Sequence, residues 1–144
     1  MYLPDNNILI NAFRADTQHH QVAKVWIEEM LNGGQSIRLF PTVETGFLRI
    51  VTHPKLFSPP SSMEEAAAFL SALCDVPNVD VCPWGAEDRD LWLKLCADMQ
   101  LVGNDCNDAM LAALAIGRGL HLVTFDKGFS RFKGLDCLIL HDHR

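Results

Sequence analysis

Four acidic residues stand at the borders of apolar segments, where side chains with a chemical role are often placed. Asp5 follows the apolar start MYLP, and Glu44 follows SIRLFPTV. Asp108 precedes AMLAALAIG, and Asp126 follows LHLVTF. Carboxylates at such borders can bind a hard metal ion, transfer a proton or cap a helix. The chemistry of the protein therefore depends on whether the fold brings these four acids together.

The apolar patterning predicts short strands that alternate with helices along the whole chain. We expect strands at residues 1–3, 36–40, 79–83, 120–125 and 135–140. We expect helices at residues 7–14, 19–34, 41–53, 61–76, 85–100 and 108–118. This alternation is typical of an α/β protein, a three-layer α/β/α sandwich with a mostly parallel central sheet.

In such a sheet the carboxyl ends of the strands and the amino ends of the helices meet at one edge, where ligands bind. All four acids are predicted to lie at that edge. Two carboxylates about 4 Å apart repel each other by roughly 1–4 kcal/mol, so the acids must protonate, pair with bases or hold a cation. Ligands that are all oxygen favour Mg²⁺ or Mn²⁺ over zinc. Such an ion can activate a water and neutralise charge at a phosphorus.

Each acid taken alone also has a structural interpretation. Asp108 could be an N-cap, which contributes about 0.5–2 kcal/mol. Asp126 could be a turn residue, Glu44 could interact with a helix dipole, and Asp5 could form an Asx turn. Capping and metal binding are compatible with each other. The placement of all four at one edge favours a shared site.

Asp105 competes with Asp108 for a place in the site, because it lies three residues earlier in the loop GNDCND. Its alternative is an ordinary solvated loop acid. Several basic residues follow the acids closely and are candidates for contacts with a substrate phosphate, with solvated surface charge as the alternative for each. These residues are Arg14, Arg49, Lys127, Arg131 and Lys133.

The composition is that of an ordinary globular chain. With 144 residues, 49% apolar and 21% charged, the sequence predicts a single domain over residues 1–144. A net charge of −6 means that binding to nucleic acid needs a local basic patch or a basic partner. Five cysteines without a C-x-x-C pair argue against a disulfide framework and a zinc site. No membrane span or signal peptide is apparent, so a cytoplasmic location is expected.

Three stretches resemble, in order, the signature blocks of the PIN (PilT N-terminus) domain. They are LPDNNILINAFRADTQHHQVAKVWIEEML, PTVETGFLRIVTHPKLF and NDAMLAALAIGRGLHLVTFDKGFSRF. The resemblance spans nearly the whole chain and is strongest to the toxin ribonucleases of VapBC toxin–antitoxin systems. It implies an endoribonuclease that depends on Mg²⁺ or Mn²⁺ and cleaves structured RNA with an activated water. It also implies a cognate VapB-like antitoxin and a homodimer.

The resemblance assigns family positions to residues of this chain. Asn7 matches a polar residue that commonly orients the first carboxylate of the family. The family's four acids match Asp5, Glu44, Asp108 and Asp126.

Three positions depart from the family pattern. Pro4 replaces a strand-forming residue, Asn6 replaces a common Thr or Ser, and Gly128 replaces a frequent acid. The last change removes an accessory ligand. None removes one of the four acids, so activity is expected.

The rival function is that of a binding module without catalysis, either an inactive PIN-like domain or a receiver-like domain. A receiver needs paired acids after its first strand, an acceptor aspartate after the third and a lysine after the fifth. This chain has only Asp5 at the first position, and Pro83 and Trp84 follow the third strand. The sequence therefore favours the nuclease.

Overall fold

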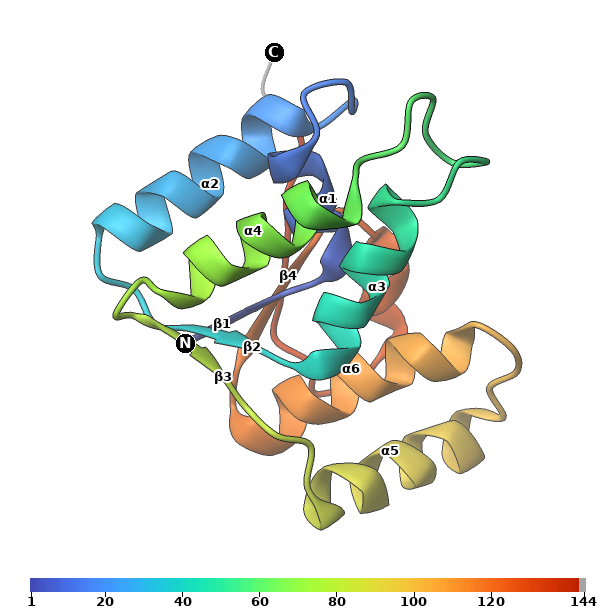
Figure 1. Cartoon of the computed structure of the whole chain (residues 1–144). Helices are drawn as coiled ribbons and strands as arrows, with labels where there is room; N and C mark the ends of the chain where they lie inside the picture. The colour runs from blue at the N-terminus through green and yellow to red at the C-terminus, as the bar shows by residue number, and fades with distance from the viewer. Residues whose placement is uncertain (143–144) are drawn as a thin grey trace.

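A computed structural model of the chain describes residues 1–142. In that part, five strands form one parallel sheet in the order β3-β2-β1-β4-β5 (Figure 1). The predicted strands are confirmed: the first is shifted by one residue, and the other four are slightly shorter than expected. They are β1 (Tyr2–Pro4), β2 (Ile37–Leu39), β3 (Val79–Val81), β4 (His121–Thr124) and β5 (Cys137–Ile139).

Helices fill the connections between the strands, as the alternating pattern predicted. They are α1 (Asn6–Phe13), α2 (His20–Asn32), α3 (Pro41–Val51), α4 (Met63–Cys74), α5 (Ala86–Met99) and α6 (Asp105–Arg118). A short 3-10 helix, η1 (Lys127–Arg131), follows β4 and was not predicted.

The predicted start of α6 at Asp108 was wrong, because the helix begins at Asp105. The backbone N–H groups of Asp105 and Cys106 already donate to Val102 and Gly103, so the chain turns before the first full helical residue. The segment GNDCN contains no proline to stop the helix earlier, and acids are favourable in a first turn. Asp108 therefore lies within the first turns of α6 and does not cap it.

The two faces of the sheet carry different helices. The connections from β1 to β2 and from β2 to β3 step one way across the sheet, and the connection from β3 to β4 steps back. Right-handed crossovers then place α1–α4 on one face and α5 and α6 on the other. Figure 1 shows α2 and α4 above the strands and α5 and α6 below them. The α/β/α sandwich is confirmed, and the order in which strands are added to the sheet changes direction between the neighbouring parallel strands β1 and β4.

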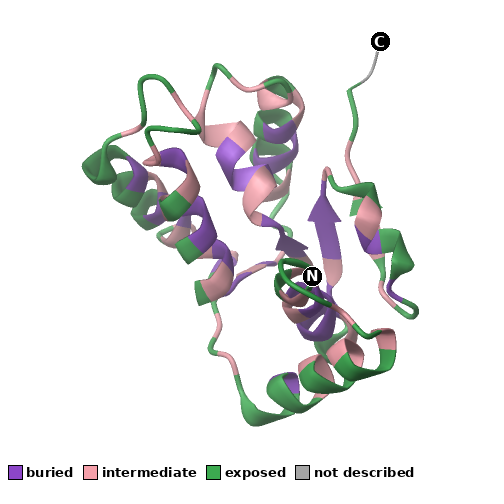
Figure 2. Ribbon diagram, turned by 90° about the vertical axis from the view of Figure 1, so that its right-hand side faces the viewer, coloured by how far each residue is buried: buried purple, intermediate pink, exposed green. Residues whose placement is uncertain are grey.

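The core is built mainly from apolar strand residues and the inner faces of the helices (Figure 2). Phe47 of α3 is fully buried and packs against Phe13 and Phe69, with both ring centroids 5.4 Å away. Phe129 and Phe132 are also buried and hold η1 against the body of the protein. These contacts fix α1, α3 and η1, the elements that border the carboxyl end of the sheet.

Helices α5 and α6 are joined by an ion pair at the end of α6. Arg118 donates to both carboxylate oxygens of Asp88, at 3.0 and 2.6 Å, and to the carbonyl of Pro83 at 2.8 Å. These bonds hold the pKa of Asp88 below its usual value. In the described part of the chain, no helix has the length and apolar character needed to cross a membrane.

Candidate active site

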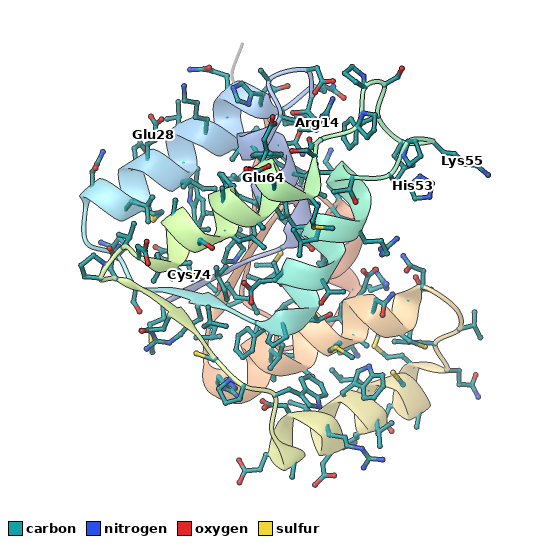
Figure 3. All side chains as sticks on the ribbon, in the orientation of Figure 1. Arg14, Glu28, His53, Lys55, Glu64 and Cys74 are labelled. Carbon is teal, nitrogen blue, oxygen red and sulfur yellow. The ribbon has the colours of Figure 1, made fainter. Side chains whose placement is uncertain are left out.

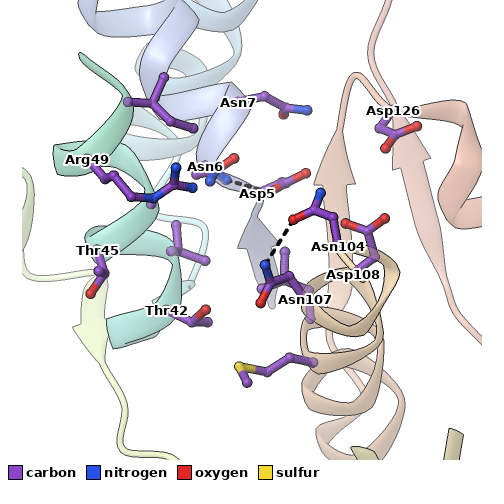
Figure 4. A pocket seen from close by; sticks show the side chains of 15 residues that line it. Asp5, Asn6, Asn7, Thr42, Thr45, Arg49, Asn104, Asn107, Asp108 and Asp126 are labelled. Carbon is purple, nitrogen blue, oxygen red and sulfur yellow. Dashed lines mark hydrogen bonds between the residues drawn. The ribbon is translucent and has the colours of Figure 1, made fainter. Parts of the chain in front are cut away.

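A pocket of about 560 Å³ opens at the carboxyl end of the sheet, between β1 and β4 (Figure 4). This is the point where the strand order changes direction, the place where ligands bind in open α/β sheets. Asp5 enters the pocket from the end of β1, Asp108 from α6, and Asp126 from the segment after β4. The structure therefore brings together three of the four predicted acids.

Asp5 lies deepest of the three, and its exposed fraction is only 7%. It is the N-cap of α1, and its Oδ1 accepts from the N–H of Asn6 at 2.7 Å. Burial raises the pKa of Asp5 to about 6, although hydrogen bonds from Thr124 and Asn6 oppose the shift. The negative charges of Asp108 and Asp126 raise the pKa of Asp5 further. Capping and membership of the acidic site thus coincide in one residue.

Thr124 connects the acids from below. It is fully buried, and its hydroxyl donates to Oδ2 of Asp5 at 2.9 Å. The same hydroxyl accepts from the N–H of Asp126 at 3.0 Å and from Nδ2 of Asn7 at 3.1 Å. The resemblance implies that Asn7 orients the first carboxylate; in this structure, Asn7 reaches that carboxylate through Thr124.

Asp126 and Asp108 lie nearer to the surface. Asp126 is the N-cap of η1, and its Oδ1 accepts from the N–H of Gly128 at 2.8 Å. Burial raises the pKa of Asp108, and the hydrogen bond that its carboxylate accepts from Arg131 partly opposes this shift. Asp105 accepts from the same guanidinium, at 3.3 Å, but does not line the pocket.

Glu44 is not brought to the pocket, so the expectation of four acids in one cleft was wrong. The pocket is lined by Thr42, Thr45 and Arg49, which share one face of α3. Glu44 is half-buried on another face, where burial raises its pKa. Its charge raises the pKa of the thiol of Cys74, which lies at the end of α4 (Figure 3). Glu44 thus faces α4, because its position around the α3 helix axis differs from that of the residues that line the pocket.

The predicted basic residues divide into two groups. Arg49 extends into the pocket from α3, opposite the acids (Figure 4), and its guanidinium makes no hydrogen bond or ion pair within residues 1–142. Lys127 and Lys133 are exposed on and after η1, outside the pocket lining. Arg131 belongs to the acidic edge through Asp108.

Arg14 is not available to the site as predicted. Its side chain is only 10% exposed and donates to Asp16, to the hydroxyl of Ser61 and to the carbonyl of Pro59. Its guanidinium also lies 4.0 Å from the ring centre of Phe57. These contacts fasten the loop that carries His53 and Lys55 (Figure 3). Arg14 therefore has a structural task away from the pocket.

Sequence reasoning missed the neutral polar residues of the site, both those that line the pocket and Thr124, which lies beneath the acids. Thr124 stands in the quoted block LVTFD, and its position directly before the acid-bearing turn was the available signal. The amides of the segment GNDCND and the threonines of PTVET were the others. The missed lining residues are Asn6, Thr42, Thr45, Asn104 and Asn107.

Oxygen donors make the pocket chemically suited to Mg²⁺ or Mn²⁺. Among the described residues, no group of three or more His, Cys, Asp and Glu side chains converges closely enough to hold a metal ion. Mg²⁺ commonly uses only one or two carboxylates and keeps several waters. The raised pKa of buried Asp5, beside two further acids, indicates negative charge that a cation would stabilise. The residues therefore fit an open metal site.

We expect Thr124→Val to lower the free energy of unfolding by about 2–3 kcal/mol, because a buried network loses its central hydroxyl. The N–H of Asp126 and the amide of Asn7 lose their acceptor, and Asp5 loses a donor. Urea denaturation measures the change. Thr45→Val is the matched control, since Thr45 is exposed, and should change stability by less than about 0.5 kcal/mol. Equal stabilities of the two variants would contradict the network.

The fold and the pocket together define a doubly wound α/β protein with an acidic site at the point where the strand order changes direction. The chain belongs to the PIN domain family, whose model matches residues 2–135. It is similar to ribonuclease VapC31 of Mycobacterium tuberculosis, with 33% identity over 132 residues that cover 92% of this chain and 93% of that protein. It is also similar to VapC ribonuclease Mb2897 of Mycobacterium bovis, with 32% identity over 135 residues, 94% of this chain and 92% of that protein.

Solved structures share the fold at lower identity. VapBC2 from Rickettsia felis, bound to a DNA fragment from its promoter, aligns with a TM-score of 0.73 and 19% identity. The alignment covers 97% of this chain and 98% of that one. VapC20 of Mycobacterium tuberculosis, a toxin that cleaves the sarcin-ricin loop, aligns with a TM-score of 0.67 and 16% identity, over 90% of this chain and 93% of that one.

Proposed function

We propose that this chain is a VapC-type endoribonuclease, the toxin of a type II toxin–antitoxin system, and that residues 1–144 act as one domain. The observation that carries the proposal is the pocket between the ends of β1 and β4, where Asp5, Asp108 and Asp126 converge from three separate elements. Membership of the PIN family and the two similar VapC ribonucleases support it. The substrate is RNA, so the protein acts in the cytoplasm.

Asp5 and Asp126 would hold Mg²⁺ or Mn²⁺ together with several waters, and Asp108 would lie beside them in the pocket. Such an ion, when bound, would supply an activated water and neutralise charge at the scissile phosphate. Thr124 keeps the carboxylate of Asp5 in place and aligns it with the turn that carries Asp126. Hydrolysis of this kind leaves a 5′-phosphate and a 3′-hydroxyl.

Arg49 is the basic residue best placed to contact RNA. It projects from α3 into the pocket, across from the acids, with its guanidinium unpaired among the described residues. A phosphate next to the scissile one would neutralise it. Lys127 and Lys133 would extend this contact outward over η1. On a chain with a net charge of −6, such a local basic edge is what admits RNA.

A VapB-like antitoxin is the expected partner. The structural neighbours from Rickettsia felis and Salmonella typhimurium are complexes of VapBC with DNA. An open acidic pocket suits a basic side chain of such a partner, which would neutralise Asp5, Asp108 and Asp126 without a metal ion. We also propose a homodimer for the free toxin.

Incubation of the purified chain with end-labelled structured RNA tests the function. Cleavage is expected with Mg²⁺ or Mn²⁺, is lost in EDTA and returns when Mn²⁺ is restored. Asp126→Asn should slow cleavage at least about 100-fold, since a metal contributes several kcal/mol to the transition state. Asp136→Asn, an exposed acid outside the pocket, is the control. A chain that binds an antitoxin but leaves RNA intact under all conditions would instead be a binding module.

A further inference from the structure

The guanidinium of Arg131 occupies a defined position at the edge of the acidic pocket. Its Nη2 donates to Oδ2 of Asp108 at 3.1 Å and to Oδ1 of Asp105 at 3.3 Å. Its Nη1 donates to the carbonyl of Gly128 at 2.5 Å, and its central carbon lies 4.7 Å from the ring centre of Phe132. Because Phe132 is buried, the guanidinium rests on a fixed surface. One cation thus already bridges two carboxylates beside the site.

Gly128 is the reason that Arg131 can take this position. A Cβ atom at Gly128 would lie 2.9 Å from Nη1 of Arg131 and 3.0 Å from Oδ1 of Asp126. A longer side chain would therefore displace the guanidinium or crowd Asp126. This is the position where the sequence departs from the family pattern by lacking an acid. An acid here would add a carboxylate beside Asp126, and glycine leaves that space to an arginine.

The charges at the pocket then fall into two parts. Asp105 and one oxygen of Asp108 are bound to Arg131, whose side chain is 33% exposed. Asp5 and Asp126 interact with no basic side chain among residues 1–142. One divalent ion balances two carboxylates. A second ion would have to break the contacts of Arg131 with both of its acids.

We infer that Arg131 takes the place of a second cation, so that this pocket binds a single divalent ion, at Asp5 and Asp126. The inference rests on the proposed function, because it concerns the metal site of the nuclease. It makes Arg131 a positioning residue, which holds Asp108 and neutralises it. The inference also gives the two arginines different roles: Arg131 acts at the metal site, and Arg49 contacts the RNA.

Counting bound Mn²⁺ ions tests the inference without an activity assay. Crystals of the full chain soaked in Mn²⁺ should show one anomalous difference peak in each pocket, and electron paramagnetic resonance in solution should show an isolated, uncoupled ion. The double variant Gly128→Asp with Arg131→Gln should show two peaks about 4 Å apart and a spin-coupled pair. Lys133→Gln removes the same charge nearby without a contact to the acids, and should keep one peak.

Three results would overturn the inference. Two peaks in the wild-type chain would show that Arg131 yields to a second ion. A single uncoupled ion in the folded double variant would show that Arg131 does not exclude one. Absence of any Mn²⁺ from a wild-type chain that also leaves RNA uncut would remove the proposed function as well. A wild-type chain that cuts RNA but binds two ions would leave the function standing and refute only the role of Arg131.

Discussion

Asp5→Asn is expected to reduce RNA cleavage by at least about 1,000-fold and, at the same time, to stabilise the metal-free protein. Asp5 supplies the most buried carboxylate of the pocket, and if it holds the ion as proposed, loss of its charge would remove about 4 kcal/mol from transition-state stabilisation. Without metal, however, that charge is buried beside two other acids. The residue most needed for activity is therefore one that costs stability.

The size of the gain follows from the pKa. Burial raises the pKa of Asp5 from 3.8 to about 6, a difference that corresponds to roughly 3 kcal/mol at pH 7.5. Asparagine has one oxygen where aspartate uses two, so it keeps only one of the bonds from Asn6 and Thr124. That loss costs about 1 kcal/mol. The net gain in the free energy of unfolding is about 1–2 kcal/mol.

Urea denaturation in EDTA measures this gain, and the pH dependence gives its sign. A raised carboxyl pKa contributes stability that is fully present below pH 3.8 and is lost as the pH rises through 6. The advantage of Asp5→Asn should therefore be present at pH 7.5 and vanish near pH 4. Asp90→Asn, at an exposed position of α5, controls for the change in net charge. Lower stability of Asp5→Asn at pH 7.5, or unchanged cleavage, would contradict the assignment.

The convergence of Asp5, Asp108 and Asp126 was predictable from sequence because it depends on topology alone. In a parallel sheet, the residues after each strand reach the same edge whatever the details of packing. Asp5 and Asp126 follow β1 and β4, which are neighbours in the sheet. The start of α6 was misplaced by three residues, yet Asp108 still reaches the pocket. An error along a helix axis of this size leaves a residue at the same end of the sheet.

The direction of a side chain around a helix was not predictable in the same way. Successive residues of a helix are about 100° apart, so Glu44 points about 200° away from Thr42, which lines the pocket. The residue types of PTVET do not indicate which face of α3 meets α4. The predicted role of Arg14 was wrong for a related reason, because its hydrogen-bond partners Pro59 and Ser61 lie in a loop that is distant in the sequence. Such contacts depend on tertiary packing.

Lowering the pH from 7.5 to 4.5 in a metal-limited assay is expected to slow cleavage about 30,000-fold, with a change of slope near pH 6. The attacking water must lose a proton, which gives about a tenfold change per pH unit throughout this range. In the proposed site Asp5 would bind the ion as a carboxylate, and burial raises the pKa of Asp5 to about 6. Below that value its ionised fraction also falls tenfold per unit. The logarithm of the rate should thus have a slope of about one above pH 6 and about two below it.

Two measurements separate this effect from acid unfolding and from other groups. Circular dichroism should show a folded protein at pH 4.5, because protonation of Asp5 favours the folded state and the pKa of Asp88 is lowered by Arg118. Saturating Mn²⁺ should move the change of slope below pH 6, because the ion competes with the proton for the same carboxylate. Asp108, whose pKa is also raised, would act in the same direction. A slope of one down to pH 4.5 under limiting metal would mean that Asp5 is not a ligand of the ion. An unchanged break at saturating Mn²⁺ would assign the titration to a group outside the metal site.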